Sequence, residues 1–83
     1  METPETVEQK MIPIIAEVLQ IPAAKVLPAA RFKDDLGADS LDLILLLYEL
    51  EDRMGAVLPD DEAKRLVTVA DAVRVVTGLL SKA

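Results

Sequence analysis

The chain contains no cysteine, histidine or tryptophan, and only one phenylalanine and one tyrosine. Without cysteine no disulfide can form, and none is needed in a reducing cytoplasm. The absence of cysteine and histidine also excludes Cys and His nucleophiles, zinc sites built on these ligands, and the usual general base. The scarcity of aromatic rings argues against nucleic acid binding by base stacking. The sequence therefore offers few routes to catalysis of its own.

Positive charge is also scarce, since nine Lys and Arg stand against 15 Asp and Glu and the net charge is −6. This balance disfavours nucleic acid and anionic membranes and favours basic partner surfaces. No apolar run of 18 residues exists, and the start METPETVEQK lacks the basic and apolar regions of a signal peptide. We therefore expect a cytoplasmic protein without membrane insertion, or a domain excised from a longer chain, with residues 1–83 forming one domain. We also expect it to be a monomer.

An amphipathic helix is predicted near the start of the chain. Its apolar residues recur at helical spacing: Val7, Met11, Ile14, Ile15 and Val18. Pro13 lies inside this pattern, where it removes a backbone hydrogen bond and clashes with the carbonyl of Gln9, at a cost of about 3 kcal/mol. Three outcomes stay open: a kink, a helix that begins near Pro13, or a surface-facing proline in a helix bent toward the core.

Residues 21–38 read as a long connection, because Ile21-Pro22 and Leu27-Pro28 oppose helix. A connection of this length in a small domain is either packed against the core or functional. Gly37 suggests a backbone conformation that a Cβ would hinder. Four apolar residues are expected to hold this segment on the core: Val26, Leu27, Phe32 and Leu36.

Three further helices complete an all-α prediction, a four-helix bundle with a short third helix. Residues 40–54 form the second, with Asp39 as N-cap and Gly55 as C-cap. A short segment from about Asp60 to Arg65 is the third. Thr68 caps the fourth, with Asp71 in capping-box position. The β-branched run 73–77 competes as a strand, but the helical spacing favours an inner stripe: Val69, Ala72, Val73, Val76 and Leu80.

The helix at 40–54 has more apolar residues than one buried stripe needs, since eight of the ten residues from Leu41 to Leu50 are apolar. One side is expected to face the core: Leu43, Leu46, Leu47, Leu50 and Met54. The rest gather beside Ser40 and are expected to be an exposed binding strip: Leu41, Ile44, Leu45 and Tyr48. The alternative is a central helix that is buried nearly all round.

Acidic residues cluster in the same part of the sequence, with seven acids and one base from Asp34 to Arg53. An apolar strip edged by acids suits a basic, partly hydrophobic partner patch. A merely solvated acidic face explains the charge but not the adjoining hydrophobes. Metal binding by Asp34, Asp35, Asp39 and Asp42 is disfavoured, because their spacing lacks the ligand order of an EF-hand.

Ser40 stands where this helix begins, and helix capping is the strongest structural explanation for it. A nucleophilic Ser40 would need a base, and Lys33 could be proposed as that base. Nothing around Lys33 builds an oxyanion site. A third role is that of an acceptor modified by another protein, since a phosphate ester is stabilised at a helix N-terminus.

The sequence FKDDLGADSLDLILLLYELEDRMGAVLPDDEAKRLVTVADAV resembles acyl carrier proteins of the bacterial fatty-acid type. The likeness covers essentially the whole chain, and DLGADSLD is its most specific part. Gly37-Ala38-Asp39 before the serine is similar to the fatty-acid type. Peptidyl and many polyketide carriers more often have Gly-Gly-His or Gly-Gly-Asp there.

The resemblance implies a four-helix bundle that is a carrier and not an enzyme. It implies that Ser40, flanked by Asp39 and Leu41, accepts 4′-phosphopantetheine from coenzyme A. A holo-carrier-protein synthase, which is a Mg²⁺-dependent phosphopantetheinyl transferase, delivers this arm, and acyl chains ride on its thiol as thioesters. Other implied partners are ketoacyl synthases, reductases and acyltransferases. The partner surface that the resemblance implies comprises Asp39, Leu41, Ile44, Tyr48, Glu51 and Asp52. We expect the neighbouring Asp42 and Leu45 to belong to the same surface.

Four positions depart from the family pattern. Leu45 stands where Glu is common, Arg53 where another acid is common, and Met54 where Phe is frequent, while Pro13 interrupts the first helix. These changes weaken the acidic signature and extend the apolar strip. They leave open a specialised carrier for a dedicated lipid, polyketide or aminoacyl pathway. An unmodified helical interaction module is the alternative from another class.

Overall fold

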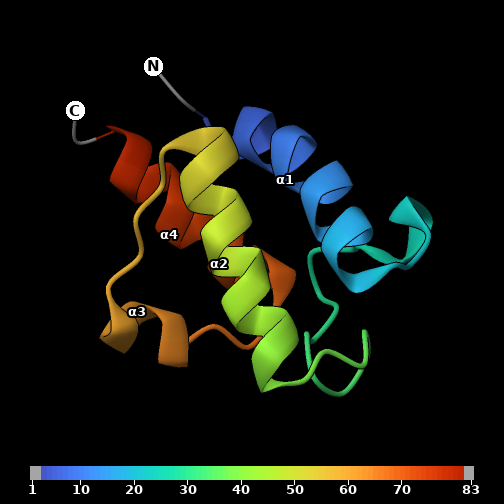
Figure 1. Cartoon of the computed structure of the whole chain (residues 1–83). Helices are drawn as coiled ribbons and strands as arrows, with labels where there is room; N and C mark the ends of the chain where they lie inside the picture. Colours follow the sequence, from blue (N-terminus) through green and yellow to red (C-terminus); the bar gives the residue numbers. More distant parts are fainter. Residues whose placement is uncertain (1–2, 82–83) are drawn as a thin grey trace.

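The computed structural model describes residues 3–81, apart from the side chain of Asp60, and is built of four α-helices (Figure 1). They are α1 (Pro4–Leu19), α2 (Ser40–Met54), α3 (Asp60–Lys64) and α4 (Val69–Ser81). A 3₁₀ turn, Ala23–Lys25, lies in the long connection between α1 and α2. Over this part of the chain the only β pairing is an isolated bridge between Arg31 and Thr68. The predicted all-α fold with a short third helix is confirmed.

Helix α1 runs without interruption through Pro13, whose side chain is exposed. A helix that begins near Pro13 was therefore the wrong expectation, and the surface-facing proline is confirmed. The carbonyl of Gln9, which loses its partner to the ring, also belongs to an exposed residue. Water can satisfy it there, so the helix tolerates the proline.

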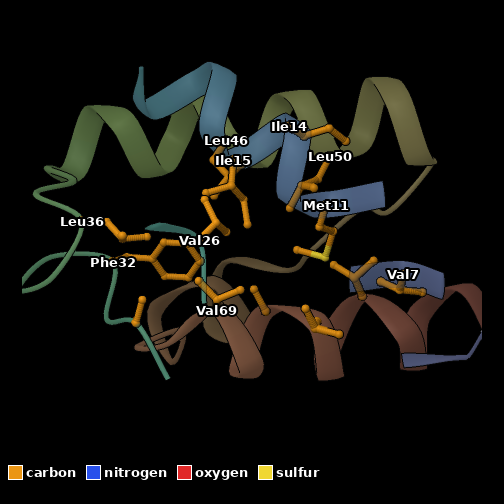
Figure 2. Close-up of a cluster of buried hydrophobic side chains, with 14 of the residues drawn as sticks. Val7, Met11, Ile14, Ile15, Val26, Phe32, Leu36, Leu46, Leu50 and Val69 are labelled. Carbon is orange, nitrogen blue, oxygen red and sulfur yellow. The ribbon is translucent and has the colours of Figure 1, made fainter. Parts of the chain in front are cut away.

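The core lies where α1, α2 and α4 meet, and the connection between α1 and α2 closes one end of it (Figure 2). Val18 and Leu80 are partly buried at its margin, and the expected helix at 73–77 is confirmed. Aliphatic residues dominate the core, as the composition requires. The buried side chains are Val7, Met11, Ile14, Ile15, Val26, Ala30, Phe32, Leu36, Ala38, Leu46, Leu50, Ala56, Val69, Ala72, Val73 and Val76.

The connection between α1 and α2 is held by packing and by backbone hydrogen bonds. Phe32 is only 1% exposed. Its N–H donates to the carbonyl of Val67 at 2.9 Å, and its own carbonyl accepts from Ala38 at 2.8 Å. Val26 and Leu36 are buried as expected. Gly37 has φ +69°, a conformation that side chains other than glycine's rarely adopt.

Leu27 does not hold the connection on the core, because its side chain is 58% exposed. That expectation was wrong. Val26 lies at the centre of a tight turn, in which the N–H of Leu27 donates to the carbonyl of Lys25 at 3.0 Å. This turn buries Val26 and leaves Leu27 on the surface.

Leu47 is also not a core residue, contrary to the helical phase expected for α2. Leu46 and Leu50 are buried, and Leu43 and Met54 pack partly buried against the core. Leu47 is half-buried and faces α3, where it lines two hollows. The reason is that α3 has only five residues and covers this side of α2 incompletely.

Helix α4 begins with the predicted capping box. The N–H of Asp71 donates to Thr68 Oγ1 at 3.1 Å, and Asp71 Oδ2 accepts from the N–H groups of Thr68 at 3.0 Å and Val67 at 3.1 Å. The Thr68 bond first, and then the Val67 bond, lower the pKa of the Asp71 carboxyl below its ordinary value. The ionised carboxylate therefore stabilises the start of α4.

Asp71→Ala should lower the free energy of unfolding at pH 7 by about 1 kcal/mol, the usual cost of losing a cap. Folding lowers this pKa, so the stabilisation is present above the pKa of the unfolded chain and is lost as the pH falls through that of the folded protein. Urea unfolding at successively lower pH measures the difference between the two proteins. It should shrink in acid, and a difference that stays constant as the pH falls would contradict the role given to the ionised Asp71 carboxylate.

Leu50→Ala should lower the free energy of unfolding by about 2–5 kcal/mol, because Leu50 is fully buried. Leu47→Ala should cost clearly less, since Leu47 lies outside the core. Urea unfolding of both variants is the measurement. Equal losses would contradict the packing described for α2.

Candidate functional site

Ser40 is the first residue of α2, and its side chain is exposed. The first turn of α2 forms the lower end of this helix in Figure 1, where the connection from α1 arrives. The positive end of the α2 dipole is at this residue. An anion attached to Ser40 would therefore be favoured electrostatically.

The cap of α2 is made by Asp39 and Asp42 and not by Ser40. Asp39 Oδ1 accepts from the N–H of Asp42 at 2.8 Å, and Asp42 Oδ2 accepts from the N–H of Asp39 at 3.1 Å. Asp39 is thus confirmed as N-cap, and Asp42 closes a full capping box. The explanation of Ser40 as a helix cap is wrong.

The hydroxyl of Ser40 makes no hydrogen bond with any residue in the range 3–81. A serine at a helix start normally uses its hydroxyl for the backbone. Here the two aspartates have taken that role, and the hydroxyl is left accessible. This arrangement suits a residue that another molecule must reach.

A hollow of about 400 Å³ lies beside Ser40, between α2 and α3. Leu43, Ile44 and Leu47 of α2 form much of its apolar lining, and Leu66 completes it from the segment after α3. Two lysines, Lys33 and Lys64, line the same hollow. The sequence reasoning considered Lys33 only as a base and missed Lys64 and Leu66.

The apolar strip next to Ser40 is exposed, as expected. The exposed fractions are 63% for Leu41, 47% for Ile44, 45% for Leu45 and 64% for Tyr48. The alternative of a helix buried nearly all round is therefore wrong. Such a contiguous patch on a small protein is typical of a binding surface.

Arg53, which stands where an acid is common in the family, forms ion pairs with residues of α1 and α2. Its guanidinium binds both carboxylate oxygens of Glu17, at 2.8 and 3.1 Å, and reaches Glu49 at 2.7 Å. The hydrogen bond from Arg53 lowers the pKa of Glu17. Arg53 thereby joins the last turn of α2 to α1. Glu51 and Asp52 have no such partner among the described residues and leave their charge on the surface.

The aspartates before α2 are engaged by the protein itself. Arg31 pairs with Asp34 at 3.5 Å and with Asp35 at 3.4 Å. The backbone N–H of Arg31 also donates to Asp35 and lowers the pKa of that carboxyl. Within residues 3–81, no group of three or more potential ligands is arranged to hold a metal ion. No described helix is long and apolar enough to cross a membrane.

Two comparisons with known proteins bear on this site. Residues 9–76 match the family model described as "Phosphopantetheine attachment site". The fold is similar to the solved structure of the acyl carrier protein from Enterococcus faecalis, with a TM-score of 0.75 and 36% sequence identity. The alignment covers 94% of this chain and 99% of that protein.

Because Asp39 makes the cap and Ser40 does not, substitutions at these two neighbouring residues should have different effects on stability. Asp39→Ala should lower the free energy of unfolding by about 1 kcal/mol, because it removes the cap. Ser40→Ala should change it by no more than about 0.5 kcal/mol, because the hydroxyl binds nothing. Urea unfolding compares the two. A loss in Ser40→Ala as large as that in Asp39→Ala would show that the hydroxyl is structural.

Proposed function

The chain belongs to the phosphopantetheine-attachment family of acyl carrier proteins, and on this premise we propose that Ser40 bears the arm and that the protein carries acyl chains in fatty acid biosynthesis. A protein of this family is a non-catalytic carrier with a covalently attached 4′-phosphopantetheine. The observation that carries the proposal is the accessible hydroxyl of Ser40, which the Asp39–Asp42 capping box leaves free.

Ser40 fits the arm better than the other serine of the chain. The sequence contains two serines, Ser40 and Ser81. Ser81 is the last residue of α4, where the negative end of the helix dipole disfavours a phosphate. Ser40 begins α2 and borders an apolar hollow with two lysines, which suits an anionic group on a flexible chain.

The proposed attachment is a group transfer to the Ser40 oxygen. A bond forms between this oxygen and the phosphorus of the arm, and the phosphoanhydride bond of coenzyme A breaks, so that adenosine 3′,5′-bisphosphate leaves. The hydroxyl proton passes to a base of the transferase, because this chain has no histidine to take it. When bound, the arm supplies the thiol that holds acyl groups as thioesters, in a chain that has no cysteine.

The exposed strip of α2 supports docking of partner enzymes. Leu41 directly follows the attachment residue, and Ile44, Leu45 and Tyr48 extend the strip along the helix. The flanking acids Asp39, Asp42, Glu51 and Asp52 favour a partner patch that is apolar at its centre and basic at its edge. We propose this surface for the holo-carrier-protein synthase and for ketoacyl synthases, reductases and acyltransferases.

The fatty-acid role is supported by Gly37-Ala38-Asp39 before the serine, and the likeness to the Enterococcus faecalis acyl carrier protein supports the acyl-carrier role. A specialised carrier for a dedicated lipid, polyketide or aminoacyl pathway is the second candidate. Leu45 favours the specialised carrier, because Glu is common at this position in the acyl carrier family. Leu45 is 45% exposed on the strip proposed for docking. One carrier domain over residues 1–83, a monomeric state and a cytoplasmic location remain predictions.

Incubation with coenzyme A, Mg²⁺ and a carrier-protein transferase should raise the intact mass by one phosphopantetheine. Ser40→Ala should gain nothing, and Ser81→Ala should gain the same mass as the unaltered protein. No gain in a folded sample would favour the unmodified interaction module. A gain in Ser40→Ala would place the arm elsewhere.

Leu41→Asp should leave stability unchanged within about 0.5 kcal/mol and raise the KM of partner enzymes, because it puts a charge in the apolar strip. Leu27→Asp is the matched control, since Leu27 is 58% exposed and lies on the connection before α2. Steady-state transfer kinetics with the loaded proteins give the comparison. Equal KM values for the two variants would show that partners dock elsewhere.

A further inference from the structure

Two lysines from distant parts of the chain line the same hollow as Ser40. Lys33 lies in the connection before α2, and Lys64 is the last residue of α3. We propose that Lys33 and Lys64 bind the phosphodiester that joins the arm to Ser40 and direct the arm toward α3. The inference rests on the proposed attachment at Ser40.

Backbone bonds around Phe32 fix the position of Lys33. The carbonyl of Phe32 accepts from Ala38 at 2.8 Å, which brings Lys33 close to the start of α2. The N–H of Phe32 donates to Val67 at 2.9 Å, which ties the same point to the segment after α3. Because Phe32 is buried, this junction is part of the core. Lys33 is therefore held between Ser40 and the end of α3.

Both ammonium groups are available for an anion. Neither Lys33 nor Lys64 makes an ion pair or side-chain hydrogen bond with any residue of the described part of the chain. Three other cations are engaged: Arg31 with Asp34 and Asp35, Arg53 with Glu17 and Glu49, and Arg74 with Asp71. The two lysines also line a second, adjoining hollow, so both lie at the boundary between the two hollows.

The acids near Ser40 have partners other than these lysines. Asp34 and Asp35 bind Arg31, and Asp39 and Asp42 bind each other's backbone N–H groups. The two capping carboxylates nevertheless lie beside the attachment residue and would repel a phosphodiester. The positive charges of two lysines that line the same hollow would offset that repulsion. Lysine binds phosphate as a mobile point charge on a long stem, so exact placement of the ammonium is not needed.

The binding of the phosphodiester on the α3 side has a consequence for docking. Lys33 and Lys64 border the hollow, whereas Leu41, Leu45 and Tyr48 lie outside that hollow on the exposed strip of α2. An arm that starts toward α3 leaves these three side chains uncovered. Partner enzymes can then contact the strip while the arm remains on the protein.

The test uses the loaded protein at low ionic strength, where exposed charges interact most strongly. Complete loading is confirmed first by intact mass, so a failure of attachment at Ser40 is recognised before the lysines are tested. The phosphorus resonance of the arm is then compared in the unaltered protein and in Lys33→Gln, Lys64→Gln and Lys25→Gln. Lys25 is the matched control, because it is an exposed lysine without an ion pair in the 3₁₀ turn Ala23–Lys25.

The resonance should shift in Lys33→Gln and in Lys64→Gln, and added salt should abolish the difference, whereas Lys25→Gln should match the unaltered protein. The ammonium signals of Lys33 and Lys64 should also move when the unloaded protein is loaded. Identical phosphorus resonances in all four proteins would overturn the proposal. So would ammonium signals that move only when a carboxylate-bearing acyl group is attached, because the anion would then be on the cargo.

Discussion

Burial of Phe32 is the constraint on which the site depends. Its side chain fills the end of the core that the helices leave open, and its backbone joins the connection to the start of α2 and to the segment before α4 (Figure 2). A connection of this length would otherwise place no residue reliably. With Phe32 fixed, Ala38 is fixed, and Asp39 and Ser40 follow at a defined end of α2. The functional geometry is thus a result of core packing.

Neighbouring residues at that end have different physical roles. Asp39 and Asp42 satisfy the backbone of the first turn, so Ser40 has nothing to bind within the protein. The helix cap and the proposed attachment are therefore assigned to different, adjacent residues. The same separation holds along α2, where Leu46 and Leu50 make the core while Leu41 and Tyr48 stay exposed. The helix can therefore leave an apolar strip exposed without loss of its own packing.

The sequence predicted well what depends on local chemistry. Helix α2 from Ser40 to Met54, its Asp39 cap and the Thr68–Asp71 box all follow from periodicity and capping preferences. Errors arose where tertiary packing decides. Leu47 is only half-buried because α3, which it faces, is short, and Leu27 is exposed because the tight turn between Lys25 and Leu27 buries Val26 instead. The placement of Lys33 and Lys64 beside the same hollow depends on the backbone bond between Phe32 and Val67, which no pattern of single residues reveals.

The free hydroxyl of Ser40 is proposed to carry the arm, and fragmentation mass spectrometry of the protein isolated from its own cells can locate that arm. We expect one phosphopantetheine, located on Ser40 and on no other residue. Its location on Ser81 or on a threonine, or its absence from every molecule of the isolated protein, would show that Ser40 does not have this role.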